Sequence, residues 1–271
     1  MPDLYPGIQW VVQRNLTNKT DLENLQRACE ITGVRCLLIE MIPFAVELPD
    51  FDNTRRSIFY GSTTLCALVA ENKQLQEGLF FDPALFSIGN YLERWGKYML
   101  NDGAVVTTFA TLMSREEAPE TLFFIRPDDD SKSFAGETKS FGDIKAWYDQ
   151  LKMVENTNLS LQSPIVVSTP YNIQYEWRLW IVNGKVIAAS KYRTYFKLTP
   201  AIGCPPEVIA FAESRCEEYM PQAVFVMDVC LCGDEFYIVE CNCMNAAGFY
   251  KADVTAIVAA VSAHFANIFS S

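Results

Sequence analysis

The sequence predicts a mixed protein in which a small α/β domain precedes an α+β domain. In the first third of the chain, short apolar runs alternate with helical stretches, which is typical of a parallel sheet. After residue 170, turn residues separate pairs of apolar runs, which indicates antiparallel hairpins. Half of the 271 residues are hydrophobic, so the chain has ample material for a buried core.

A polar stretch, Ser114–Glu120, divides the chain into an α/β domain over residues 1–118 and an α+β domain over residues 119–271. The Val34–Ile42 run is apolar throughout, which is typical of a strand buried on both faces. Gly33 is a usual helix end. The elements expected in the first domain are strand Ile8–Val12, helix Leu22–Thr32 with Asp21 as its cap, strand Val34–Ile42, strand Ser57–Tyr60 and helix Pro83–Leu100.

Hairpins are expected to dominate the second domain. Asn183-Gly184 lies between two apolar runs, and this pair favours the two-residue turn of a hairpin. A second hairpin turns around Gly233-Asp234. The elements expected are strand Leu122–Arg126, polar loop Pro127–Gly136, helix Phe141–Lys152, strand Pro164–Ser168, hairpin Glu176–Tyr192, helix Pro205–Glu218, hairpin Ala223–Asn242 and helix Val254–Ile268.

The charge of the chain argues against nucleic acid as a partner. Lys and Arg total 22 against 33 Asp and Glu, a net charge of −11, whereas nucleic-acid-binding domains carry basic surfaces.

We see no signal-peptide pattern and no apolar stretch of membrane-spanning length, so we expect a cytoplasmic protein without a membrane partner. His264 is the only histidine, which removes Ser-His-Asp and Cys-His catalysis and most His-based zinc sites.

Three oxygen-bearing side chains of the second hairpin are expected to converge. Alternate residues of a strand share a face, so Glu240 and Asn242 are neighbours, and Asp228 lies on the partner strand. Two carboxylates and an amide suit Mg²⁺, which binds few protein ligands and also contacts substrate phosphates. The alternative is a solvated hairpin with ordinary surface acids, and the apolar residues that flank these acids weigh against it.

Several cations stand in apolar segments. Arg126 ends a strand, Arg178 lies within Trp177–Trp180, and Lys191 and Arg193 are expected to share a face of the returning strand. A guanidinium in such surroundings needs an anionic partner. A triphosphate and internal ion pairs both meet this need, and the residues alone leave both open.

Two Cys-x-Cys pairs on the second hairpin raise the question of a zinc site. The pairs are Cys230 with Cys232 and Cys241 with Cys243. Strand parity argues against zinc, because the two pairs face opposite ways if the acids of this hairpin converge. We expect reduced, free thiols, as is usual in cytosolic proteins. The chain also lacks the glycine-rich dinucleotide fingerprint and the P-loop, so an ATP site would be of another kind.

The order of these stretches resembles the ATP-grasp superfamily, and most closely its phage- and bacteria-associated clade named for two arginines and a lysine. The resemblance implies an ATP-grasp fold, in which two α+β lobes clasp ATP behind a small α/β pre-ATP-grasp domain. Two departures concern the substrate side: the phosphate loop has one glycine, Gly136, and Asn245–Gly248 replaces the usual proline-glycine. The matching stretches are Phe123–Gly136, Glu176–Arg193, Met227–Val229, Val239–Asn242 and, in the first domain, Phe59–Ser62.

The resemblance also implies residue roles, with ATP and Mg²⁺ as cofactors. Arg126, Arg178 and Lys191 would be the catalytic cations that hold the phosphates. Asp228, Glu240 and Asn242 would hold the metal. Further nucleotide contacts would come from Lys132 in the loop above the phosphates, Val167, Ser168 and Thr169 beside the adenine, Glu176 near the ribose or metal, and Arg193.

The implied reaction is ATP-dependent ligation of a carboxylate to an amine through an acyl phosphate. The substrates are unidentified, and a peptide or protein is a candidate. Phosphoryl transfer depends on positioning and charge neutralisation more than on acid–base side chains, which suits a chain with one histidine. Two alternatives stay open: a kinase on the same fold, and a nucleotide-binding interaction module without turnover.

Overall fold

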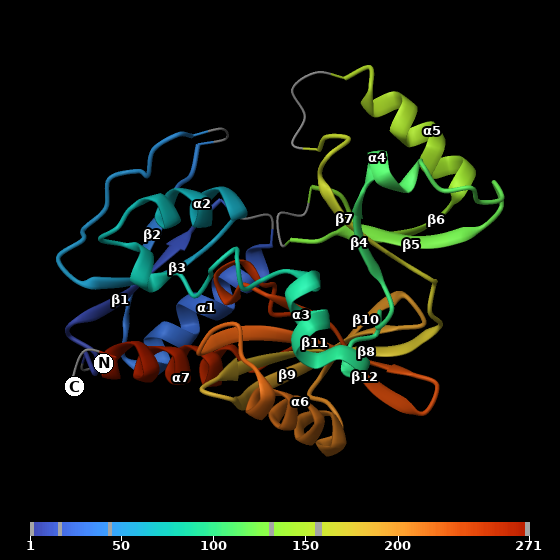
Figure 1. The fold of residues 1–271 in the computed structure, drawn as a ribbon. Coiled ribbons are helices and arrows are strands. Elements are labelled where there is room, and N and C mark those ends of the chain that lie inside the picture. The colour runs from blue at the N-terminus through green and yellow to red at the C-terminus, as the bar shows by residue number, and fades with distance from the viewer. Residues whose placement is uncertain (1–2, 16–17, 43–44, 130–132, 155–158, 269–271) are drawn as a thin grey trace.

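The computed structural model describes residues 3–15, 18–42, 45–129, 133–154 and 159–268. A front α/β domain, a smaller lobe and a larger lobe make up the molecule (Figure 1). The elements are β1 (Ile8–Gln13), α1 (Lys19–Thr32), β2 (Arg35–Ile39), β3 (Arg56–Tyr60), α2 (Thr63–Glu71), η1 (Gln76–Gly78), α3 (Ile88–Trp95), η2 (Gly96–Tyr98), β4 (Val105–Thr108), α4 (Phe109–Leu112), β5 (Leu122–Pro127), β6 (Glu137–Ser140), α5 (Phe141–Leu151), β7 (Pro164–Ser168), β8 (Ile173–Val182), β9 (Lys185–Thr194), β10 (Lys197–Ile202), α6 (Pro206–Glu218), β11 (Val224–Cys232), β12 (Glu235–Asn242), η3 (Met244–Ala246) and α7 (Val254–Asn267).

The front domain contains the predicted parallel sheet, in the order β2-β1-β3. All of β1 is buried, whereas Leu38 of the edge strand β2 is 38% exposed. The prediction that Val34–Ile42 is buried on both faces is therefore wrong, because a run of apolar residues does not reveal which strand occupies the centre of a sheet.

Two predicted helix starts in the front domain need correction. Asn18 rather than Asp21 caps α1, since its side chain accepts hydrogen bonds from the Thr20 and Asp21 N–H groups. Asp21 is buried and accepts a hydrogen bond from the distant Phe249 N–H (3.4 Å). The helix predicted from Pro83 begins only at α3, where Ser87 is the cap. Gly33 ends α1 in the left-handed conformation, as predicted.

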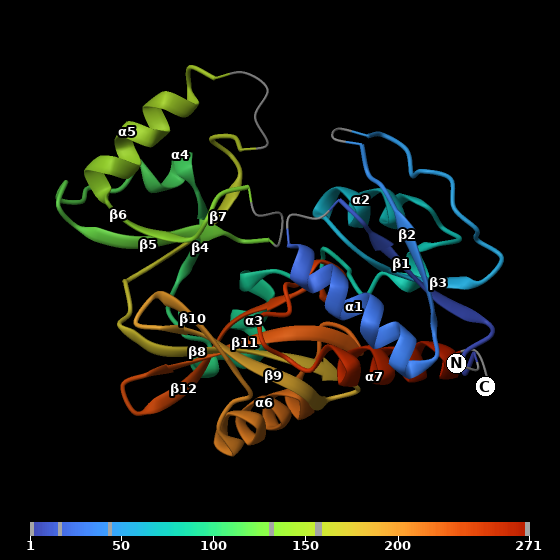
Figure 2. The ribbon, with the colours of Figure 1, turned by 180° about the vertical axis from the view of Figure 1, so that it is seen from behind.

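The smaller lobe is an antiparallel sheet in the order β4-β7-β5-β6. Helices α4 and α5 lie on its outer face and share a core with the side chains of Ile125, Ile165 and Val167 (Figure 2). Strands β4 and β6 were not predicted. Because β4 pairs with β7, this sheet takes residues from both sides of position 118.

The larger lobe is a five-stranded antiparallel sheet in the order β10-β9-β8-β11-β12. Its first hairpin turns at Asn183 (φ 51°) and Gly184 (φ 76°), as predicted. Helices α3 and α6 pack on one face, and α7 packs between the opposite face and the front domain, where it also contacts α1. Within the described part of the chain, each helix is too short or too polar to cross a lipid bilayer.

The segment after β12 joins the larger lobe to the front domain. The Asn245 side chain accepts a hydrogen bond from Phe80 N–H (2.8 Å) and donates to the carbonyls of Phe59 (2.6 Å) and Gly78 (2.9 Å). Asn245 is fully buried. The asparagine that departs from the usual proline-glycine pattern therefore fixes the front domain beside the last residue of β12.

Candidate functional site

A cavity of about 380 Å³ lies between the inner faces of the two lobes. Such a volume is within the range of small-molecule sites in proteins. The smaller lobe contributes Phe124, Arg126 and Ser168, and the larger lobe contributes Glu176, Tyr192, Arg193, Phe196 and Glu240.

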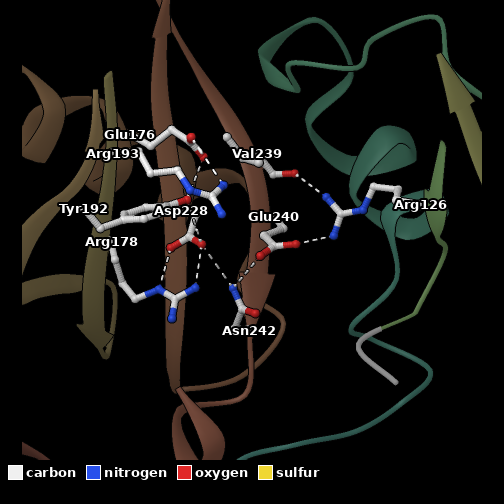
Figure 3. A network of polar contacts seen from close by, with 9 residues as sticks. All are labelled: Arg126, Glu176, Arg178, Tyr192, Arg193, Asp228, Val239, Glu240 and Asn242. Carbon is white, nitrogen blue, oxygen red and sulfur yellow. Dashed lines mark hydrogen bonds and ion pairs between the residues drawn. The ribbon is translucent and has the colours of Figure 1, made fainter. Parts of the chain in front are cut away.

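Three charged side chains form a row across the larger lobe. Arg178, Asp228 and Glu240 stand directly opposite one another on the adjacent strands β8, β11 and β12. Arg178 donates two parallel hydrogen bonds to Asp228, from Nε to Oδ1 (2.8 Å) and from Nη2 to Oδ2 (2.7 Å) (Figure 3). Asn242 Nδ2 donates to Glu240 Oε1 (3.2 Å) and lies 3.5 Å from Asp228 Oδ2. The structure thus brings the three predicted metal ligands together.

Arg126 connects the smaller lobe to this row. Its guanidinium forms an ion pair with Glu240 and donates to the Val239 carbonyl (3.4 Å). A β-bulge in β12 leaves Val239 without an opposite residue in β11. Burial acts to raise the pKa of Glu240, but the nearby Arg126 and Arg178 outweigh it and lower this pKa to about 2. Glu240 is therefore ionised at neutral pH.

A second β-bulge, in β9, decides which side chains face the cavity. Glu176 pairs with Arg193, but Trp177 pairs with Lys191, so Tyr192 is the extra residue. Tyr192 donates to Glu176 Oε2 (2.7 Å), and Arg193 Nη1 lies 3.5 Å from Glu176 Oε1. Burial raises the pKa of Glu176, although Tyr192 and Arg193 act to lower it.

The β9 bulge overturns the expectation that Lys191 and Arg193 share a face. Lys191 pairs with Trp177, whose side chain packs in the core on the α6 side of the sheet. Its Nζ lies 5.7 Å from the centre of the Tyr175 ring, and Lys191 does not line the cavity. Simple alternation along β9 fails because one inserted residue reverses the parity.

Of the three residues predicted beside the adenine, one lines the cavity and two do not. Ser168 lines the cavity, and its hydroxyl donates to the Thr169 carbonyl (3.2 Å). Val167 instead packs into the core of the smaller lobe, since it faces away from Ser168 in β7. Thr169 is exposed and is not among the lining residues. Lys132 lies outside the described residues.

Aromatic side chains complete the site, and the sequence reasoning missed them. The rings of Tyr192 and Tyr250 stack with their centres 5.1 Å apart, and the Arg178 guanidinium lies 5.6 Å and 5.3 Å from those two centres. Tyr250 has a positive φ of 52°, which is rare for a bulky residue and marks a constrained position. Tyr192 lines the cavity because of the bulge in β9, and no pattern in the sequence indicates that bulge.

The donor set of the converging residues fits Mg²⁺ chemically. Asp228, Glu240 and Asn242 offer only oxygen ligands, which a hard cation prefers, and Asp228 and Asn242 are almost fully buried. Among the described residues no three His, Cys, Asp or Glu side chains gather in metal-binding geometry. None of the nine cysteines forms a disulfide bond.

Solved structures share this fold at low sequence identity. The RimK domain protein ATP-grasp from Sphaerobacter thermophilus is 14% identical, with a TM-score of 0.55 over 97% of this chain and 100% of that chain. D-cycloserine synthetase DcsG is 13% identical, with a TM-score of 0.61 over 97% of this chain and 99% of that chain. The ATP-grasp ligase PsnB, in complex with precursor peptide PsnA2 and AMPPNP, is 12% identical, with a TM-score of 0.57 over 98% and 99%. These likenesses confirm the predicted ATP-grasp fold.

Sequence comparison defines the family. A search of curated proteins gave no match. The model of the family described as ATP-grasp domain, R-two-K clade family 3, matches residues 67–261, from α2 through most of α7. This match covers well over half of the chain and includes each site residue described above. The chain therefore belongs to family 3 of the R-two-K clade of ATP-grasp domains.

Proposed function

We propose that this protein is an ATP-dependent carboxylate–amine ligase that acts through an acyl phosphate and accepts a peptide or protein as one substrate. One observation carries the proposal: beside a cavity between the two lobes, Arg126 pairs with Glu240, Arg178 with Asp228, and Arg193 with Glu176. Three cations and a metal site match the charge of a triphosphate. PsnB, which shares the fold, is complexed with precursor peptides and, in another structure, with Mg and ADP.

The proposed reaction has two steps. A substrate carboxylate oxygen attacks the γ-phosphorus of ATP, the bond to the β-phosphate oxygen breaks, and ADP leaves. An amine nitrogen then attacks the acyl carbon, the carbon–oxygen bond to phosphate breaks, and the amine proton passes to solvent. Each step builds negative charge on oxygens, which guanidinium groups already in contact with the bound nucleotide would stabilise without rearranging during the step.

The residues divide these tasks by position. Arg126 is bound to Glu240, and it would exchange this partner for a phosphate oxygen when nucleotide enters. Asp228, Glu240 and Asn242 would hold Mg²⁺, which would neutralise phosphate charge. Arg178 would hold Asp228 in place through its two parallel hydrogen bonds. We place the reaction in the cytoplasm, where free thiols of the kind seen here persist.

Product analysis tests this proposal. The protein is incubated with ATP, Mg²⁺, a mixture of amino acids and short peptides, and hydroxylamine, which traps acyl phosphates as hydroxamates. We expect ADP and phosphate in equal amounts, matched by the sum of hydroxamate and ligated product. AMP with pyrophosphate contradicts the mechanism, a stable phosphorylated product supports a kinase, and unchanged ATP supports the interaction module.

Two cations of β9 are expected to differ in their effect on nucleotide affinity. Replacing Arg193 by Met removes a charge that lines the cavity, so the Kd for ADP with Mg²⁺ should rise about fivefold to tenfold. The matched change Lys191→Met alters a residue on the opposite face, so Kd should stay within about twofold. Calorimetric titration measures both values. An effect of Lys191→Met as large as that of Arg193→Met would contradict the placement of the bulge.

A further inference from the structure

The turn between β9 and β10 combines two aromatic residues with a backbone that favours other residues. Thr194 pairs with Lys197, so Tyr195 and Phe196 are the central pair of a two-residue turn. Their φ angles are 45° and 65°. Positive φ at both positions is the type I′ pattern, for which Asn-Gly is preferred. Bulky side chains are strained at these angles.

The same chain contains a turn of this kind with the favoured residues. Asn183 and Gly184 join β8 to β9 with φ angles of 51° and 76°. Because both turns have a left-handed central pair, folding alone would also favour Asn-Gly between β9 and β10. Strained backbone of this kind is concentrated at sites that contact ligands. The aromatic pair therefore points to a function.

The position of the turn indicates which of its two rings can contact a ligand in the cavity. Tyr195 and Phe196 are 54% and 57% exposed, so neither contributes to a core. Phe196 lines the cavity between the lobes, whereas Tyr195 does not. Tyr195 N–H donates to the Gln174 carbonyl (2.9 Å), which fixes the turn beside Ile173, another lining residue. The turn backbone thereby places Phe196 at the cavity, although more than half of its surface is exposed.

Apolar and cationic side chains both line the cavity. Phe124, Ile173 and Phe196 are apolar, and Arg126 and Arg193 are cationic. A nucleotide combines the same two kinds of chemistry, in a flat base and a polyanionic tail. We infer that the Phe196 ring caps the nucleoside end of the bound nucleotide by stacking on its base, a contact that aromatic rings make with any base. This inference rests on the proposed nucleotide site.

Exchange of the turn separates this role from a structural one. In the double variant Tyr195→Asn/Phe196→Gly, the strained pair is replaced by the Asn-Gly pair of the β8–β9 turn. The melting temperature should rise by about 2–5 °C, while the Kd for ADP with Mg²⁺ should rise about tenfold. Affinity for inorganic triphosphate with Mg²⁺ should change less than about twofold. A purely structural turn would instead lose stability and affinity together.

Single variants assign the effect to one ring. Tyr195→Asn should leave ADP affinity unchanged, Phe196→Gly should weaken it, and Phe196→Trp should preserve it. If the wild-type protein binds ADP and Phe196→Gly binds it equally well, the cap is wrong and the proposed function stands. An equal loss of triphosphate affinity would also overturn the assignment to the nucleoside. If the wild-type protein binds no ADP, both the cap and the proposed function are overturned.

Discussion

Replacing Arg178 by Met is expected to lower the free energy of unfolding by about 3–5 kcal/mol at neutral pH. Asp228 is 1% exposed, and Arg178 is its bidentate partner. Burial already raises the pKa of Asp228 against the attraction of Arg178. Without this arginine a buried carboxylate lacks its counter-charge, and urea denaturation of the two proteins measures the loss.

A second substitution distinguishes this cause from a general loss of packing. The double variant Arg178→Met/Asp228→Asn removes both charges, so it should recover at least half of the loss. Arg178→Lys should not recover it, because one ammonium group cannot form two parallel hydrogen bonds to a carboxylate. The loss in Arg178→Met should also shrink as pH falls, since protonation neutralises a carboxyl whose folded-state pKa is raised. A double variant as unstable as Arg178→Met would contradict this explanation.

Glu240→Gln should remove about 2 kcal/mol of stability above pH 4.5. The pKa of Glu240 falls from an ordinary 4.5 to about 2, each unit corresponds to about 1.4 kcal/mol, and the 25% exposure of its side chain reduces the total. A depressed folded-state pKa stabilises fully above the unfolded-state value. The difference between the two proteins should therefore persist at neutral pH and shrink as pH falls from 4.5 towards 2.

An exposed ion pair supplies the matched control. Glu213 accepts from Lys185 (2.9 Å), and the Lys185 side chain is 70% exposed. Glu213→Gln should cost less than about 1 kcal/mol at neutral pH, as is usual for surface pairs. Equal losses in the Glu213→Gln and Glu240→Gln proteins would show that the Arg126–Glu240 pair between the lobes stabilises the protein no more than a surface ion pair does.

Local sequence signals predicted most of the fold. The Asn183-Gly184 turn, the helix end at Gly33 and the apolar strands of both hairpins carry strong local preferences, and the structure agrees with them. Strand β10 was missed because all six of its residues are exposed and one is Pro200, a residue that strands tolerate mainly at sheet edges and bulges. The places of β1 and β2 in the front sheet depend on contacts that no local pattern records.

The site was predicted less completely, because part of it also depends on contacts that no local sequence pattern records. Strand alternation correctly predicted that Asp228, Glu240 and Asn242 lie together. Alternation failed at Lys191, because the bulge at Tyr192 reverses parity. Bulges and contacts between lobes depend on tertiary packing, so a pattern with period two cannot show them.

Thermal unfolding with and without ADP and Mg²⁺ tests the central claim, that the cavity between the lobes binds a metal–nucleotide complex. At about one hundred times the Kd, ligand adds roughly 2.7 kcal/mol, which for a chain of this size raises the melting temperature by about 5–10 °C. We predict such a rise only when ADP and Mg²⁺ are both present, and a much smaller rise in Glu240→Gln. No rise at millimolar ADP, or an equal rise without Mg²⁺, would contradict the claim.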